Sequence, residues 1–252
     1  MTSFLKWNYN LFISSLKKIN LSIILIMILD VLFYLFSGFL IIFWLQRIQS
    51  KIASFNLPSD IVASGYENIQ QLIYEAKIFL FLIIFSLIIL LIAIIFFASI
   101  LKGIIWAKTT NTRISFVLIS KFLALNLIWM SFWFVLIFLI SFFVQANVVY
   151  TFMITVIIIS FYFTNTLYSI FVKEQKFKSI ISAIKLNITK IQLFLLPYAV
   201  ISLIFFIIVK LGSLLKFNYS YILVGLLIII YIAVVRYYIS TLVFEFASQY
   251  KY

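Results

Sequence analysis

The sequence predicts an all-α integral membrane protein that crosses the membrane six times. Hydrophobic residues make up 66% of its 252 residues and charged residues only 10%, whereas soluble domains are about half apolar and a quarter charged. The apolar segments are long and lack the alternating pattern of β-barrel strands. Because backbone polar groups in lipid must hydrogen-bond within their own segment or a closed barrel, we interpret these segments as helices.

Six segments are long enough to cross the hydrocarbon layer, which takes roughly 20 helical residues. The apolar stretch 122–172 is too long for one crossing, and Gln145-Ala146-Asn147 divides it into two spans joined by a tight turn. The fifth span is the shortest and contains Pro197 near its start. The predicted spans are residues 21–45, 78–101, 122–144, 148–172, 193–209 and 221–244.

Residues 46–77 form the largest predicted loop, on the outer side between the first two spans. We expect a turn at residues 56–58, followed by a helix start capped by Ser59 or Asp60. From Tyr66 onward, the sequence favours a helix that continues into the second span.

Three segments, residues 3–19, 112–121 and 176–191, show the spacing of a helix with one apolar and one cationic face. We interpret them as helices that lie at the membrane interface, although spacers enriched in lysine would be the simpler alternative. In 176–191 the apolar positions are Phe177, Ile180, Ile181, Ile184, Ile188 and Ile191, and the opposite positions are Lys178, Ser182, Lys185 and Thr189. In 3–19 they are Leu5, Tyr9, Phe12, Leu16 and Ile19, opposite Ser3, Lys6, Asn10, Ser14 and Lys17.

Each amphipathic segment precedes two spans, so the chain is predicted to contain three hairpins, each introduced by a basic interfacial helix. The first and third units share a short similarity, Ile13-Ser-Ser-Leu-Lys17 and Ile181-Ser-Ala-Ile-Lys185. This similarity is too short to establish a duplication, and we infer a repeat of layout only.

The distribution of Lys and Arg predicts the orientation, since basic residues accumulate in cytoplasmic loops. With the N-terminus inside, 13 basic residues, Lys102 among them, lie on the cytoplasmic side and 5 on the outer side. We therefore expect both termini in the cytoplasm. The net charge of +13 then indicates contact with anionic headgroups and not with nucleic acid, with Lys17, Lys18, Lys178 and Lys185 as the predicted headgroup contacts.

The composition argues against an enzyme. The chain has no cysteine and no histidine, which excludes Cys/His metal sites, haem held through either residue, and Ser-His or Cys-His nucleophiles. Its six acidic residues are scattered along the chain, so we expect no cofactor and no metal.

Asp30 and Arg236 are charged residues inside predicted spans. By helical rise they lie about 14 Å and about 12 Å from the cytoplasmic ends of their spans, which makes an ion pair between the first and last spans feasible. Such a pair could be a proton- or ion-coupled site, or a structural tie that closes the helix bundle. We favour the structural interpretation. Asn126, Thr164, Asn165 and Thr166 form a second candidate polar cluster, whose members are expected to hydrogen-bond neighbouring helices.

The segments LKGIIWAKTTNTRISFVLISKFLALNLIW (101–129) and FKSIISAIKLNITKIQLFLLPYAVISLI (177–204) resemble a group of uncharacterised prokaryotic six-helix membrane proteins. That group includes the membrane domain attached to some glycerophosphodiester phosphodiesterases. The resemblance implies an all-helical domain in a prokaryotic cytoplasmic membrane. It implies no hydrolase activity, because this sequence contains nothing like the catalytic barrel.

Together these observations favour a non-enzymatic membrane scaffold, membrane-shaping element or complex subunit that binds anionic lipids. A second copy of the chain or another membrane protein is left open as a partner. The alternative is a transporter or channel that uses Asp30 and Arg236, and a lipid-modifying enzyme ranks third.

Overall fold

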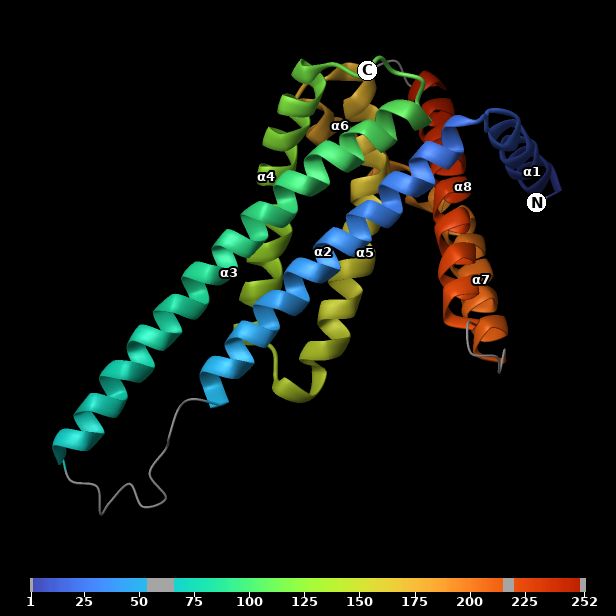
Figure 1. Ribbon diagram of the computed structural model, residues 1–252. Helices are drawn as coiled ribbons and strands as arrows, with labels where there is room; N and C mark the ends of the chain where they lie inside the picture. Colours follow the sequence, from blue (N-terminus) through green and yellow to red (C-terminus); the bar gives the residue numbers. More distant parts are fainter. Residues whose placement is uncertain (1, 54–65, 215–219, 250–252) are drawn as a thin grey trace. The chain divides into compact units, whose positions relative to one another are not determined.

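The computed structural model describes residues 2–53, 66–214 and 220–249, and these residues form eight α-helices (Figure 1). Six of the helices are long and apolar enough to cross a membrane, which confirms the predicted all-α fold with six spans. The helices are α1 (Thr2–Lys17), α2 (Ser22–Ala53), α3 (Tyr66–Thr109), α4 (Phe116–Phe143), α5 (Ala146–Glu174), α6 (Ser179–Thr189), α7 (Ile191–Leu214) and α8 (Ser220–Gln249).

Within the segment predicted as the outer loop, 46–77, α3 begins at Tyr66, which confirms the helix predicted from that residue into the second span. Helix α2 differs from the prediction, because it continues to Ala53 and not only to residue 45. The first turns of α3 are stabilised on their exposed side, where Gln71 Nε2 donates to Glu75 Oε1 at 3.2 Å, one helical turn away. The predicted turn at 56–58 and the cap at Ser59 or Asp60 lie outside the described residues.

The predicted interfacial helix over 112–121 does not form as a separate element. Helix α3 ends at Thr109, and Asn111 adopts a left-handed conformation with φ of 53°, which asparagine tolerates better than most residues. Ser115 then caps α4, since its Oγ accepts a hydrogen bond from the Leu118 N–H at 3.1 Å. Residues 116–121 are therefore the first turns of the third spanning helix.

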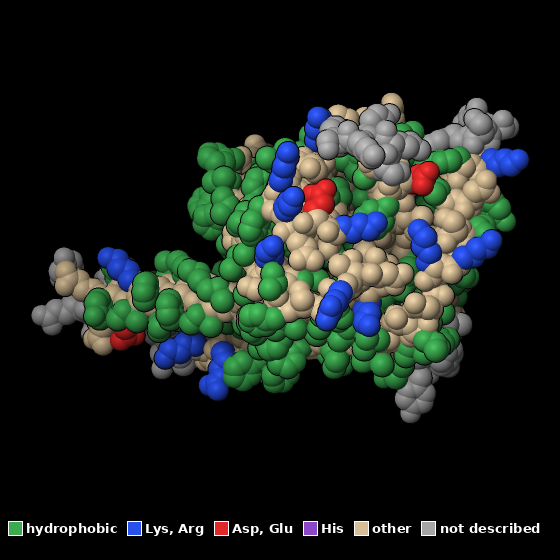
Figure 2. Space-filling view, turned by 90° about the horizontal axis from the view of Figure 1, so that it is seen from above, with side chains coloured by type: hydrophobic (Ala, Val, Ile, Leu, Met, Phe, Trp, Pro, Cys, Tyr) green, Lys and Arg blue, Asp and Glu red, His purple; other side chains and the backbone are tan. Residues whose placement is uncertain are grey.

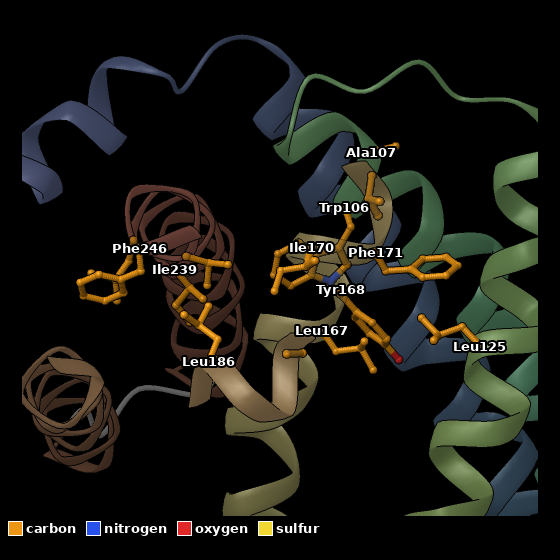
Figure 3. Close-up of a cluster of buried hydrophobic side chains, with 14 of the residues drawn as sticks. Trp106, Ala107, Leu125, Leu167, Tyr168, Ile170, Phe171, Leu186, Ile239 and Phe246 are labelled. Carbon is orange, nitrogen blue, oxygen red and sulfur yellow. The ribbon is translucent and has the colours of Figure 1, made fainter. Parts of the chain in front are cut away.

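The chain divides into two bodies. The first contains Met1–Val31 and Ser99–Tyr252, and the second contains Leu32–Ala98. In the first body α5 and α8 are central: α5 packs against α4, α6 and α8, and α8 packs also against α1 and α7. Side chains from these helices and from the end of α3 form one buried apolar cluster (Figure 3), which includes Trp106, Phe122, Tyr168, Phe171, Leu186, Phe194, Ile239 and Phe246.

The second body consists of residues 32–53 of α2 and 66–98 of α3 among the described residues. Trp44 Nε1 donates to Ser86 Oγ at 3.0 Å, and the rings of Phe36 and Phe97 lie 4.2 Å apart between centroids. Large side chains thus join these two helix segments.

Helices α1 and α6 do form, but each has three faces where the sequence predicted two. The fully buried face contains neither predicted stripe, although Ile180 and Ile184 of the α6 apolar stripe are partly buried against the apolar cluster. In α6 it consists of Ser179, Ala183, Leu186 and Asn187, and in α1 of Asn8, Leu11 and Ser15. Small residues such as Ser15 and Ala183 let helix backbones approach closely, and α1 packs on α8 while α6 packs on α5.

The predicted apolar stripes of α1 and α6 are largely exposed on the protein surface. In α6, Ile181 is 68% exposed and Ile188 is 61% exposed. Tyr9 and Phe12 of α1 are exposed as well. Each helix therefore presents three stripes in the same rotational order: a packed stripe, an exposed apolar stripe and a lysine stripe.

Candidate functional site

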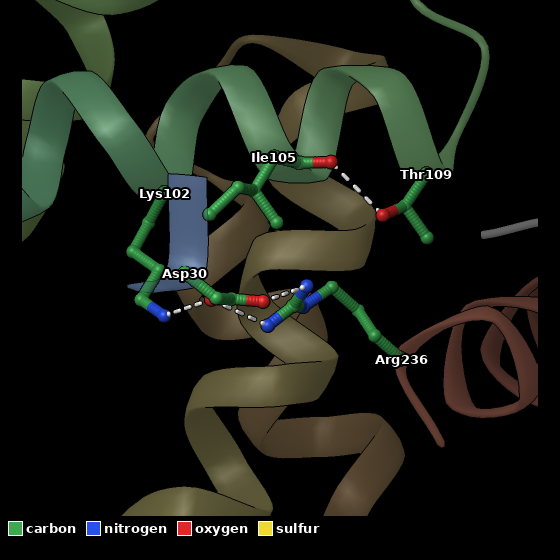
Figure 4. Close-up of polar contacts among 5 residues, drawn as sticks. All are labelled: Asp30, Lys102, Ile105, Thr109 and Arg236. Atoms are coloured by element: carbon green, nitrogen blue, oxygen red, sulfur yellow. Dashed lines mark hydrogen bonds and ion pairs between the residues drawn. The ribbon is translucent and has the colours of Figure 1, made fainter. Parts of the chain in front are cut away.

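Three charged side chains from three helices meet inside the first body (Figure 4). Arg236 of α8 donates two hydrogen bonds to the Asp30 carboxylate of α2, with 2.9 Å between Nη1 and Oδ2 and 3.1 Å between Nη2 and Oδ1. Lys102 Nζ of α3 lies 2.7 Å from Asp30 Oδ1. The Asp30, Arg236 and Lys102 side chains are 1%, 7% and 15% exposed. We call these residues the charge triad.

The charge triad lies in an apolar setting at some depth from the helix ends. Counting 1.5 Å per residue, Asp30 is about 12 Å from the start of α2 at Ser22. Lys102 is about 10 Å from the end of α3 at Thr109. The residues one turn away, Ile26 and Ile105, are fully buried. A carboxylate at such depth requires a partner, and the triad supplies two.

The triad carries one more positive than negative charge, because one carboxylate faces an ammonium and a guanidinium. The guanidinium carbon of Arg236 lies 5.8 Å from the centre of the Trp106 ring, which is within the range of a cation–π attraction. Both Asp30 oxygens accept charged hydrogen bonds. Both oxygens of the carboxylate are therefore engaged with cations from two other helices.

Lys102 is the member of this site that the sequence analysis missed. We counted it among the cytoplasmic loop residues because the second span was predicted to end at residue 101. Helix α3 instead continues for two more turns through Ile104, Ile105, Trp106 and Ala107. This apolar stretch after Lys102 was the available signal that the lysine lies inside the helix.

The predicted polar cluster is not a single cluster. Asn126 joins three helices, because its Nδ2 donates to Ser99 Oγ at 3.0 Å and its Oδ1 accepts from Tyr168 OH at 2.6 Å. The other members bond elsewhere. Thr164 Oγ1 accepts from Trp129 Nε1, Thr166 Oγ1 donates to Asn187 Oδ1, and the Asn165 backbone carbonyl accepts from Ser169 Oγ. The Thr164 and Thr166 contacts tie neighbouring helices together, whereas the Asn165 contact lies within α5, and the four residues share no ligand position.

The helix ends near the triad carry a strongly basic surface, which we call the cationic face. The four lysines predicted to contact headgroups, Lys17, Lys18, Lys178 and Lys185, are all exposed on it. Figure 2 looks onto this end and shows many more basic than acidic side chains. Its described basic residues are Lys6, Lys17, Lys18, Lys108, Arg113, Lys121, Lys173, Lys176, Lys178, Lys185 and Lys190, and Glu174 and Glu245 are its described acids outside the triad.

The arrangement is suited to binding anions and holding helices together. Within the described ranges, no group of three or more His, Cys, Asp or Glu side chains could hold a metal ion. No family model, curated protein or solved structure matches the chain. The resemblance to prokaryotic six-helix membrane proteins therefore stays an expectation.

Proposed function

We propose that this integral membrane protein acts as a non-catalytic scaffold or complex subunit whose cationic face binds anionic lipid headgroups of the cytoplasmic leaflet. The observation that carries the proposal is the three-stripe surface of α1 and α6. In both helices an exposed apolar stripe runs beside an exposed lysine stripe, although a third stripe is already packed on the protein.

The apolar stripe needs a lipid environment. Isoleucine and aromatic side chains such as Ile181, Ile188 and Phe12 are exposed in the protein. Burying apolar surface is worth about 25 cal/mol per Å², so these stripes favour contact with acyl chains over contact with water. The adjacent lysines then lie at headgroup level, as in other interfacial helices.

The charge of the cationic face supports anionic headgroups as the partner. A basic side chain near an anionic membrane surface contributes about 1 kcal/mol to the free energy of membrane binding. The face has eleven described basic residues and two described acids outside the triad, so its attraction to an anionic leaflet is large even after screening by salt.

The proposal is tested by lipid selection from a mixed bilayer. The purified protein is extracted from vesicles of phosphatidylglycerol and phosphatidylcholine, and the retained lipids are quantified by mass spectrometry. The wild-type protein should be enriched in phosphatidylglycerol. Replacement of four lysines of the cationic face by glutamine should lower the apparent affinity for phosphatidylglycerol at least tenfold. The positions are Lys17, Lys121, Lys178 and Lys185.

A matched control removes four basic residues elsewhere: Arg47, Lys51, Lys77 and Lys210, which are exposed and lie toward the opposite ends of their helices. This control variant should keep most of the enrichment. A wild-type protein that retains both lipids in the bilayer ratio would refute the proposal, as would an equal loss in both variants.

Transport is a second candidate, favoured by one observation: three charged side chains meet at depth in the spanning helices. It predicts a current or solute flux across liposomes that Asp30→Asn abolishes and Lys210→Gln leaves intact. Liposomes that show no flux with a broad set of ions would argue against it.

A further inference from the structure

We infer that Lys18 and Lys173 form a clamp for a single phosphate group, which makes one defined lipid site within the cationic face. This inference rests on the proposed function and goes further, because it names the residues and the ligand group. The phosphate could belong to an anionic lipid headgroup or to a soluble phosphate ester.

The two lysines reach the same turn of α8 from different helices. Lys18 follows the last residue of α1, and its Nζ donates to Thr241 Oγ1 at 3.2 Å. Lys173 lies in the last turn of α5, and its Nζ lies 3.3 Å from the centre of the Phe244 ring. Thr241 and Phe244 are three residues apart on α8, a spacing at which Cβ atoms are about 5–6 Å apart.

The two ammonium groups face no carboxylate of their own. Within the described part of the chain neither forms an ion pair, and the two charges repel each other. Glu174, next to Lys173 in the chain, accepts a hydrogen bond from Ser179 Oγ at 2.8 Å through its Oε2. Glu245 follows Phe244 directly and is turned by about 100° from it around the α8 axis.

A phosphate group fits this arrangement in charge and in hydrogen-bonding capacity. A phosphodiester carries one negative charge and two non-bridging oxygens, so each of these oxygens can accept a hydrogen bond from one ammonium group. Charge-assisted hydrogen bonds of this kind are about twice as strong as neutral ones. The negative charge of the phosphate also offsets the repulsion between Lys18 and Lys173. The two lysines therefore bind the phosphate cooperatively.

The packing keeps the clamp in place without the ligand. The α8 residues on either side of Thr241 are buried, including Ser240 and Leu242. Thr241 is itself oriented, since its hydroxyl donates to the Tyr237 carbonyl at 3.0 Å. One lysine is therefore directed by a fixed hydroxyl and the other by an aromatic ring.

The test counts lipids bound to the full-length protein by native mass spectrometry. The wild-type protein should retain one phosphatidylglycerol under conditions that remove phosphatidylcholine. The double variant Lys18→Gln with Lys173→Gln should lose this adduct, with an affinity at least tenfold lower. The matched variant Lys178→Gln with Lys185→Gln removes the same charge from another part of the cationic face, at α6, and should lower the affinity much less than the Lys18 and Lys173 double variant.

Two further measurements separate the other outcomes. Lys18→Arg with Lys173→Arg keeps both charges and should keep the adduct, which guards against misfolding of the glutamine variant. Glycerol 3-phosphate, added without anionic lipid, should give a weaker thermal shift than phosphatidylglycerol. A shift from glycerol 3-phosphate alone that depends on Lys18 and Lys173 would assign the clamp to soluble phosphates.

Equal loss of the adduct in both glutamine variants would overturn the clamp and leave the proposed function intact, because binding would then be spread over the whole cationic face. Retention of the adduct in the Lys18 and Lys173 double variant would overturn it as well. By contrast, a wild-type protein without any phosphatidylglycerol enrichment refutes the proposed function itself.

Discussion

Replacing Asp30 with asparagine removes the carboxylate that separates two buried cations. In the native protein the carboxylate lies 2.7 Å from Lys102 and 2.9 Å from Arg236. Asparagine has nearly the same shape and volume as aspartate, so the substitution leaves almost no cavity. The loss is electrostatic: an ammonium and a guanidinium remain buried together with no counter-charge.

The three members of the charge triad should differ strongly in the cost of removal. Taking one partner from a buried ion pair typically costs about 3–5 kcal/mol, and we expect Asp30→Asn to fall in this range. Arg236→Met leaves the Asp30–Lys102 pair and should cost about 1–3 kcal/mol. Lys102→Met leaves the two-bond Asp30–Arg236 pair and removes the excess charge, so its cost should stay below about 1 kcal/mol.

Unfolding in mixed micelles measures this order. The purified variants are titrated with sodium dodecyl sulfate, and tryptophan fluorescence follows the transition, for which Trp106 beside Arg236 is a local reporter. Adding Lys102→Met to Asp30→Asn should restore part of the lost stability, because it removes one of the two repelling charges. Equal destabilisation by Lys102→Met and Asp30→Asn, or a double variant that is the least stable of all, would contradict this electrostatic explanation of the charge triad.

Two more predictions concern helix packing and use the same unfolding assay. A Cβ added at Gly212 of α7 would overlap the Val224 side chain of α8, whereas one at Gly225 meets nothing within 4 Å. Gly212→Ala should therefore cost about 1–3 kcal/mol, and Gly225→Ala should be neutral or stabilising; the reverse order would contradict this packing. Asn126→Leu should cost about 1–2 kcal/mol and Tyr168→Phe about 0.5–1 kcal/mol. Their double variant should cost less than the sum, since the two side chains share one hydrogen bond.

The six spans could be predicted because the length and apolar character of a membrane helix are set by the bilayer. Their ends could not, since a helix continues past the hydrocarbon wherever its backbone bonds are satisfied. The C-terminal end of α3 shows this, as the helix ends only at Thr109 and the span was predicted to end at residue 101. The Asp30–Arg236 contact could be predicted because the two residues lie at similar distances from the cytoplasmic ends of their spans. Lys102 was missed because the second span was predicted to end at residue 101, which placed the lysine in a loop.

The packed faces of α1 and α6 were beyond the reach of periodicity alone. In the sequence, each helix was described by an apolar stripe and a lysine stripe, and the small residues between these stripes were given no role. Those residues, such as Ser15 and Ala183, turned out to be buried. They occupy matching positions in the Ile13–Lys17 and Ile181–Lys185 segments, so the short similarity corresponds to a shared way of docking.

The predicted helix at 112–121 fails for a local reason. Asn111 and Ser115 supply a left-handed residue and an N-cap within five positions. These two signals end one helix and start the next, and they leave no room for a separate interfacial helix between α3 and α4.

The most direct test of the account is the membrane side on which the cationic face lies. The chain has no cysteine, so single cysteines at Arg113, Lys185 and Lys210 can be labelled with a thiol reagent that does not cross membranes. If the cationic face lies in the cytoplasm, Lys210→Cys is labelled from outside intact cells, and Arg113→Cys and Lys185→Cys are labelled only after the membrane is opened. Labelling of Arg113→Cys and Lys185→Cys from opposite sides would contradict it.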